Sequence, residues 1–148
     1  MTRIISLILC SILMASCSQN CTNPNPFIDY SSEVDVSRIV DGDTFDFLIK
    51  GEEFSVRVLN IDCFETKHND RLKGQAERAG ISVDSAYVLG HIAKNLADSL
   101  LTGKRVRILR DSTEEDFDAY GRLLRVVLIN NMRYDSILKA RGLGAPVF

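Results

Sequence analysis

Apolar and polar residues alternate along three short segments early in the chain, the pattern of half-buried β-strands. The first segment covers residues 34–40, the second 44–49 and the third 54–59. Asp41-Gly42 separates the first two, and Lys50-Gly51-Glu52-Glu53 separates the second from the third. Both linkers have the composition of tight turns, so the pattern predicts three strands joined as a meander.

A helical period replaces the strand pattern further along the chain. Ser82 is a suitable N-cap, and Gly103 stands where a glycine ends many helices. Between them, six apolar residues fall on one face of a helix: Ala86, Leu89, Ala93, Leu96, Ala97 and Leu100. The pattern predicts a long helix with one buried face.

Two more strands and a short helix complete the predicted elements. Strands are expected over residues 104–110 and 121–129, a turn at Asn130-Asn131, and a helix over 134–141 that ends at Gly142. Five strands with a helix between the third and the fourth follow the order of an OB-fold, a β-barrel with helices in the α+β class. Other five-stranded layouts would give the same pattern.

The first residues have the features of an export signal. Arg3 precedes the apolar run of residues 4–14, which is too short to span a bilayer, and small residues follow in Met14-Ala15-Ser16-Cys17. This ending resembles the lipobox of bacterial lipoproteins, in which the cysteine is lipidated and becomes the first residue. An ordinary secretory signal is the alternative. In both cases we expect an exported protein.

The signal divides the chain into three parts. We expect a lipoprotein signal peptide over 1–16, a flexible tether rich in Ser, Asn and Pro over 17–33, and the OB-fold domain over 34–148. Lipid on Cys17 would anchor the protein to a membrane, with the outer membrane favoured because Ser18, and not aspartate, follows. We expect a monomer.

Charge and cysteine content limit the possible functions. The 148 residues carry a formal net charge of −2, and removal of residues 1–16 would leave 17 basic against 20 acidic residues. This balance argues against tight non-specific binding of nucleic acid, which is usually driven by excess positive charge. After cleavage, Cys21 and Cys63 remain besides Cys17, and two free thiols are favoured over a disulfide between them.

Acidic and basic side chains gather where the predicted strands end. Asp41, Asp43 and Asp62 flank the strand that carries Arg57, and Arg122 follows a second turn. Carboxylates hold hard cations such as Ca²⁺, and arginines stabilise the charge that develops on a phosphoryl group. The set of residues therefore predicts a site that cleaves phosphodiesters.

The same residues carry a resemblance to a known family. In chain order they are Ile39-Val40-Asp41-Gly42-Asp43-Thr44, Arg57, Ile61-Asp62, Glu65-Thr66-Lys67-His68 and Tyr120-Gly121-Arg122. In this order and spacing the chain resembles the staphylococcal nuclease (thermonuclease) family over about residues 34–144. The resemblance implies a Ca²⁺-dependent nuclease that cleaves DNA or RNA and leaves 3′-phosphates.

The resemblance also implies individual roles. Asp43, Asp62 and the main-chain carbonyl of Cys63 would bind Ca²⁺, whereas Asp41 is read as a turn residue that bonds its own backbone. Glu65 would orient or deprotonate the attacking water, and Arg57 and Arg122 would stabilise the transition state. The remaining candidates are expected to be surface residues: Arg38, Arg125, His68 and His91.

Several departures from the family favour an alternative function. The family has proline where Phe64 stands, so the neighbouring loop is expected to be looser. Residues 111–118 are acidic where the family is basic, Ala119 replaces a common lysine, and the chain ends at Phe148 without the family's C-terminal helix. Residues 70–81 are longer than usual and are expected to cover exposed core. A catalytically impaired OB-fold lipoprotein that binds nucleic acid or a partner is the alternative.

Overall fold

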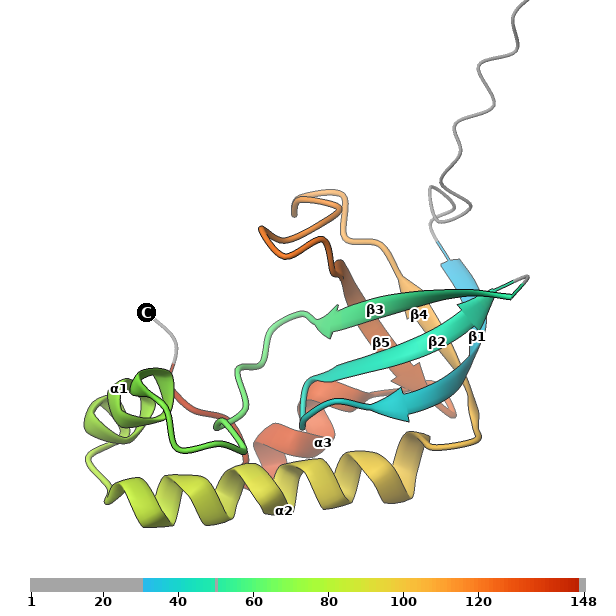
Figure 1. The fold of residues 1–148 in the computed structure, drawn as a ribbon. Helices are drawn as coiled ribbons and strands as arrows, with labels where there is room; N and C mark the ends of the chain where they lie inside the picture. Colours follow the sequence, from blue (N-terminus) through green and yellow to red (C-terminus); the bar gives the residue numbers. More distant parts are fainter. Residues whose placement is uncertain (1–30, 50, 147–148) are drawn as a thin grey trace, which may run out of the picture.

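The computed structural model describes residues 31–49 and 51–146 (Figure 1). The predicted signal, Cys17, Cys21 and most of the predicted tether lie outside the described residues. The strands are β1 (Ser31–Ile39), β2 (Thr44–Ile49), β3 (Glu52–Val58), β4 (Arg105–Leu109), β5 (Leu123–Ile129) and β6 (Met132–Arg133). The helices are α1 (Asp70–Ala79), α2 (Val83–Leu101) and α3 (Tyr134–Ala140).

The strands form a closed barrel, which confirms the five-stranded OB-fold prediction. Their order is β3-β2-β1-β4-β5-β6, and β3 also pairs in parallel with β5, so the sheet closes on itself. The two-residue β6 only extends the edge of β5. β1 begins at Ser31, three residues before the predicted start, because polar residues 31–33 pair with β4.

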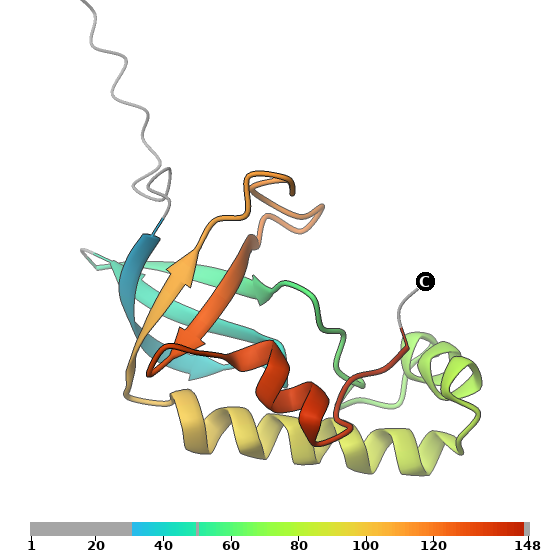
Figure 2. The same cartoon turned by 180° about the vertical axis from the view of Figure 1, so that it is seen from behind.

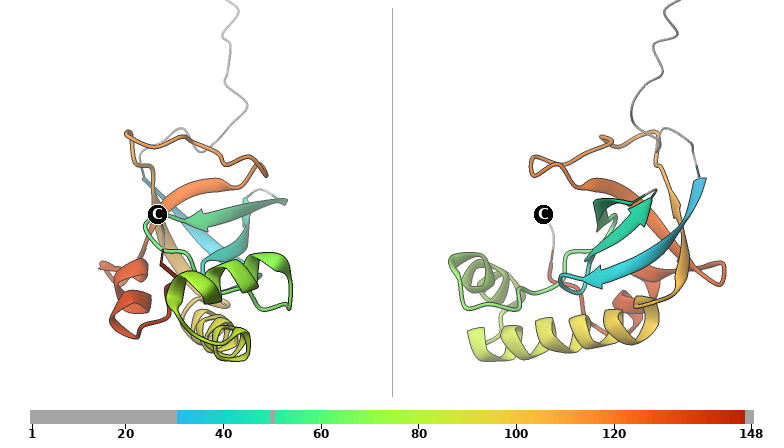
Figure 3. Two further views of the ribbon diagram at one scale, coloured as in Figure 1. Left: turned by 90° about the vertical axis from the view of Figure 1, so that its left-hand side faces the viewer. Right: turned by 45° about the vertical axis from the view of Figure 1, so that its right-hand side comes forward.

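Two helices close one end of the barrel. Ala93, Ala97 and Leu101 of α2 share the main core with strand residues, and so do Tyr134 and Leu138 of α3. Figure 2 and Figure 3 show α3 beside α2 at this end of the barrel. The predicted cap of α2 is confirmed, since the side chain of its N-cap Ser82 accepts a hydrogen bond from the Ser85 amide at 3.0 Å.

Helix α1 was not predicted from the sequence pattern. It lies beyond the barrel, beside the first turns of α2 (Figure 3). Its Leu72 and Ala76 join Phe64 and Ala86 in a second apolar cluster. The insertion over 70–81 therefore covers core, as expected, but as an ordered helix. Phe64 is itself buried there, so packing holds the loop that was expected to be loose.

Arg125 was predicted to lie on the surface, and this was wrong. Its side chain is 1% exposed and its Nη1 lies 2.7 Å from Oδ1 of Asp116. Along β5, Arg125 shares the inward face with buried Leu123 and Val127. The arginine thus anchors the acidic segment 111–118 to the barrel. Arg38 does lie on the surface and pairs with buried Asp46 at 2.5 Å.

Replacing Arg125 tests this anchor. Arg125→Ala removes one partner of a largely buried ion pair and leaves Asp116 without its closest cation, so we expect the free energy of unfolding to fall by about 3 kcal/mol. Thermal and urea unfolding measure the loss. Arg105→Ala, which breaks the exposed pair with Asp35, should change stability much less. Equal effects of the two variants would contradict a structural role for Arg125.

Candidate active site

Two carboxylates converge on one guanidinium group at the candidate site. Asp43 is 1% exposed, and its Oδ1 pairs with Nη1 of Arg57. Nη2 of the same arginine lies 2.6 Å from Oδ1 of Asp62. The second oxygen of Asp43 accepts a hydrogen bond from the Cys63 amide. The structure therefore brings together Asp43, Asp62, Cys63 and Arg57 as the sequence predicted.

Local strand geometry explains this convergence. Val56 and Val58 are buried in the barrel, so Arg57 between them points to the other face, where 14% of its side chain is exposed. Thr44 pairs with Arg57 across β2 and β3, which places the preceding Asp43 beside the arginine. Asp41 acts as the predicted turn residue, because its Oδ1 accepts the Asp43 amide at 3.1 Å.

Arg122, which lies between the acidic segment and β5, also belongs to the site. Its Nη1 donates to Oγ1 of Thr44 at 3.1 Å, and that hydroxyl lies 3.3 Å from Oδ1 of Asp43. Asp118 holds the same guanidinium at its Nε and Nη2, at 2.7 and 2.6 Å. The exposed ring of Tyr120 lies 5.4 Å from the guanidinium carbon. Thr44 contacts Arg122 directly and Arg57 through Asp43, so a chain of contacts joins the two predicted arginines.

Helix α1 supplies two site residues that the sequence analysis missed. Gln75 is fully buried and donates to Oδ2 of Asp62 at 2.9 Å and to the Cys63 carbonyl at 2.8 Å. Its own carbonyl oxygen accepts the Glu65 amide at 2.9 Å. Arg71 lies 2.8 Å from Oδ1 of Asp62 and 3.1 Å from Oε1 of Glu65. These contacts fix the backbone and the carboxylates of residues 62–65.

The role of Gln75 can be tested by a change of similar length. Gln75→Met removes all three bonds and leaves buried polar groups of residues 62, 63 and 65 unsatisfied, so we expect a loss of at least about 2 kcal/mol of stability. Differential scanning calorimetry measures the effect. Glu77→Met, at an exposed position of the same helix, is the control. Unchanged melting of Gln75→Met would show that Phe64 and Arg71 hold the loop without Gln75.

Glu65 lies at the edge of the same group of charges. Its side chain is 24% exposed, and its carboxylate is held by Nε of Arg71 and by Nδ2 of Asn69, the latter at 3.4 Å. The buried residues Asp43 and Asp62 lack this access to solvent. Among the predicted residues, Glu65 is thus the carboxylate placed to exchange a proton with water.

Burial and neighbouring charges set the protonation of the site. Burial favours the neutral form of Asp62, but the hydrogen bond from Gln75 and the charge of Arg57 outweigh it, and the pKa of Asp62 is lowered. Burial raises the pKa of Asp41 despite the nearby Arg57. Burial also raises the pKa of the Cys63 thiol to about 12, so this free cysteine is an inert neutral side chain at physiological pH.

The donor set suits a hard cation with few protein ligands. No cluster of three or more His, Cys, Asp and Glu side chains able to hold a metal occurs in the described residues. The predicted set instead has two carboxylates and one main-chain carbonyl, all oxygen donors of the kind Ca²⁺ prefers. Oδ1 of Asp43 and Oδ1 of Asp62 bond the same guanidinium, so they face a common point. The oxygen donors are therefore of the type that Ca²⁺ prefers, and in this structure the Arg57 guanidinium occupies the point that they face.

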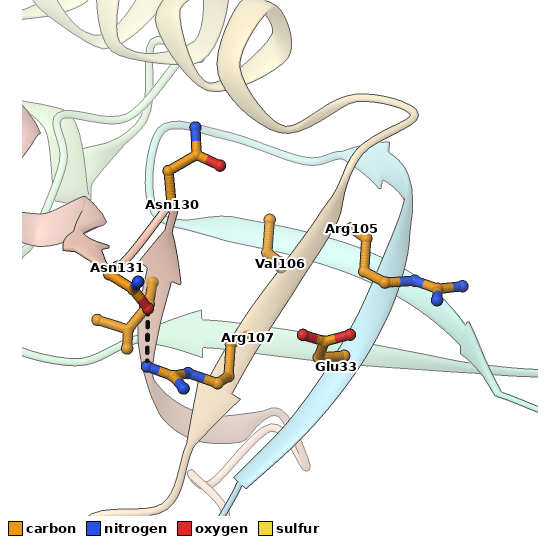
Figure 4. Close-up of a pocket in the computed structure, with 7 residues that line it drawn as sticks. Glu33, Arg105, Val106, Arg107, Asn130 and Asn131 are labelled. Carbon is orange, nitrogen blue, oxygen red and sulfur yellow. Dashed lines mark hydrogen bonds between the residues drawn. The ribbon is translucent and has the colours of Figure 1, made fainter.

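Another pocket of the molecule is separate from these residues. It has a volume of about 180 Å³ and lies over β1, β4 and the turn after β5, and Figure 4 shows it with Arg105, Arg107 and Asn131. Arg107 donates to Asn131 at 3.2 Å, and Arg105 is bonded to Asp35 by two nitrogens. None of the predicted site residues lines this pocket, and its arginines already have partners.

The two histidines lie near Glu65 and differ in exposure. His68 is exposed, as predicted, and belongs to the loop before α1. His91 on α2 is half-buried, and its Nε2 is shielded from solvent without a hydrogen-bond partner. The prediction of a surface position was therefore wrong for His91. Tyr87, one turn earlier on α2, covers part of the His91 ring.

Comparison with known proteins identifies the fold family. The family model described as staphylococcal nuclease homologue matches residues 55–147, more than half of the chain. An uncharacterized protein of Methanocaldococcus jannaschii, MJ1439, is 33% identical over 99 residues, which cover 65% of this chain and 48% of that protein. The chain thus spans about half the length of this curated relative.

Proposed function

Because the chain belongs to the staphylococcal nuclease homologue family, we propose that it is a hydrolase that cleaves phosphodiester bonds of DNA or RNA with the help of Ca²⁺. The family and the nuclease-type barrel are shown by the match over residues 55–147. The cation, the reaction and the products are our inference from the arrangement of the site.

One observation carries the proposal. Asp43, Arg57, Asp62, Glu65 and Arg122 come from four separate segments, and contacts at hydrogen-bond distance join them into one group, directly or through Thr44 and Arg71. A barrel needs none of these charges for its core. Carboxylates for a hard cation, a carboxylate near water and two fixed guanidinium groups are the components that phosphodiester hydrolysis requires.

Asp43, Asp62 and the carbonyl of Cys63 would hold the Ca²⁺. When bound, the ion supplies positive charge and Lewis acidity to a phosphoryl oxygen. The protein contributes a preformed oxygen set: the Cys63 amide orients Asp43, and Gln75 orients both Asp62 and the Cys63 carbonyl. We propose that Gln75 is a positioning residue that does not touch substrate.

Glu65 and the arginines act on the substrate. Glu65 takes the proton of the attacking water, and Arg71 orients its carboxylate. Arg57 and Arg122 donate to the phosphate oxygens, where charge grows in the transition state. Both guanidinium groups are held in place by carboxylates before substrate binds, so little reorganisation is needed. By resemblance to the family, the products carry 3′-phosphates.

Cleavage assays test the proposal. The purified protein is incubated with plasmid DNA and with RNA in about 1–10 mM Ca²⁺ and in excess chelator. We expect cleavage of nucleic acid only with Ca²⁺, and end-group analysis should find 3′-phosphates. Binding without cleavage under all conditions would instead support the alternative of an OB-fold binding module.

We also propose that the protein is exported and anchored by lipid on Cys17. No helix among the described residues is long and apolar enough to cross a membrane. Cys17→Ala should move the protein from the membrane fraction to the soluble fraction, because acyl chains would provide the attachment. Mass spectrometry of the N-terminus detects the lipid on Cys17, and fractionation measures membrane association. A variant that stays in the membrane fraction, or wild type without lipid, would contradict the anchor.

A further inference from the structure

Three aromatic side chains form a stack next to the candidate site. The rings of His68 and Tyr87 are nearly parallel, with centroids 4.3 Å apart and planes inclined by 17°. His91 meets the same tyrosine edge-on, with centroids 4.5 Å apart. Tyr87 and His91 stand one turn apart on α2, whereas His68 precedes α1. The stack therefore joins the loop before α1 to α2.

Exposure increases along this stack. His91 and Tyr87 are half-buried, and His68 at the outer end is exposed. Tyr87 covers one face of the His68 ring, and no further ring contacts His68 within the part of the chain that the structure describes. Because the residue is exposed, its other face is open to solvent. The two inner rings hold the imidazole in a fixed orientation.

The stack is anchored beside Glu65 at two points. Asn69, the neighbour of His68, donates to Oε2 of Glu65 at 3.4 Å, and its own Oδ1 caps α1 by accepting the Leu72 amide. On the other side, a Cβ at Gly90, one turn after Tyr87, would come within 2.5 Å of the Glu65 carbonyl oxygen. The neighbours of His68 and Tyr87 in the chain thus contact Glu65, Asn69 at its carboxylate and Gly90 at its main-chain carbonyl.

A nucleobase is the ligand that suits such a surface. Bases stack on histidine and other aromatic rings in single-stranded nucleic acids, largely independently of sequence. Stacking also does not require an excess of positive charge, and this chain has a negative net charge. The arginines of the site are already paired with carboxylates, so phosphate contacts alone provide limited affinity.

We propose that the open face of His68 binds one base of the nucleic-acid substrate, next to the phosphodiester that Arg57 and Arg122 hold. This inference rests on the proposed nuclease function and adds a base-binding subsite to it. Tyr87 and His91 are positioning residues for His68. The subsite favours single-stranded substrates, because a base must leave its pair to stack on a protein ring.

Binding of two probes tests the subsite. Fluorescently labelled oligothymidylate and an oligomer of equal length made of abasic units are titrated with the protein in chelator, and affinity is read from anisotropy. We expect His68→Ala to weaken binding of oligothymidylate about tenfold, within the range known for base stacking, and to leave the abasic oligomer unchanged. His68→Phe should retain the preference for bases. Lys67→Ala, at an exposed neighbour, should affect both probes equally.

Each outcome has a definite meaning. Equal weakening of both probes by His68→Ala would overturn the subsite and leave the stack as a support for the loop. Wild type that does not prefer oligothymidylate to the abasic oligomer would also overturn it. Cleavage with Ca²⁺ but no base preference would remove the subsite and retain the nuclease, whereas base preference without cleavage would retain the subsite and remove the nuclease.

Discussion

Arg122→Lys should lower kcat by about a hundredfold or more while changing KM far less. Arg122 uses three nitrogens: two bond Asp118 and one bonds Thr44, which leads to Asp43. A lysine offers a single ammonium group and cannot make both contacts, nor bridge two phosphate oxygens. Loss of one preorganised donor to transition-state charge typically costs 10²–10³ in rate. Initial rates over a range of substrate concentrations, at saturating Ca²⁺, separate kcat from KM.

A matched control separates an effect on catalysis from the general effect of replacing an arginine by lysine. Arg107→Lys makes the same chemical change on β4, at an exposed position away from the predicted site residues. It should retain wild-type kcat. The melting temperature of Arg122→Lys should also be measured, because Arg122 connects Thr44 of β2 to Asp118 of the acidic segment. Near wild-type turnover of Arg122→Lys would assign Arg122 to stabilising that segment instead.

The strands and the main helix could be predicted because their signals are local and regular. Alternation of apolar residues located the barrel strands, and Ser82 and Gly103 marked the two ends of α2. The same alternation placed Arg57 opposite buried Val56 and Val58, as the structure has it. Residues two apart in a strand share a face, so the same pattern also places Arg125 on the inward face with Leu123 and Val127. A charged side chain usually lies on the surface, but Arg125 is buried because Asp116 pairs with it.

Helix α1 was missed because its composition resembles a loop. Only Leu72, Gln75 and Ala76 of its ten residues are buried, and Gly74 lies in its middle. Its capping residues were nevertheless visible: Asn69 caps the first turn, and Gly80 ends the helix at φ 65°. Gln75 could not be assigned to the site from sequence. Its three bonds depend on the tertiary contact between α1 and the loop after β3.

The candidate site residues that the sequence grouped by family order do lie together in the structure, but their pairing could not be predicted. Sequence gave no sign that Arg57 would lie between the two acids or that Asp118 would bind Arg122. These pairings change the interpretation of the acidic segment. Asp116 and Asp118 serve as partners of Arg125 and Arg122, so part of its charge is neutralised within the fold.

Asp43→Asn should abolish both cleavage and stabilisation by Ca²⁺. The amide keeps an oxygen to accept the Cys63 hydrogen bond but removes one of the two charges that face the cation. For wild type we expect weak Ca²⁺ affinity, roughly 10⁻⁴–10⁻³ M, because only two carboxylates bind directly and Arg57 already offsets their charge. A ligand at 10–100 times its Kd stabilises the folded state by about 1.4–2.7 kcal/mol. Calorimetry in about 10 mM Ca²⁺ should therefore show a clear rise in melting temperature.

The control for this change is another buried aspartate on the neighbouring strand. Asp46→Asn on β2 alters a carboxylate that is also 1% exposed but pairs with Arg38, so it should lower stability and retain the Ca²⁺ effect. Mg²⁺ should support little cleavage by wild type, since it gives up its waters reluctantly and demands tighter geometry. If Asp43→Asn still responds to Ca²⁺, or if Ca²⁺ changes neither melting nor cleavage of wild type, the assigned cation site is wrong. The binding-module function would then explain the barrel better than hydrolysis does.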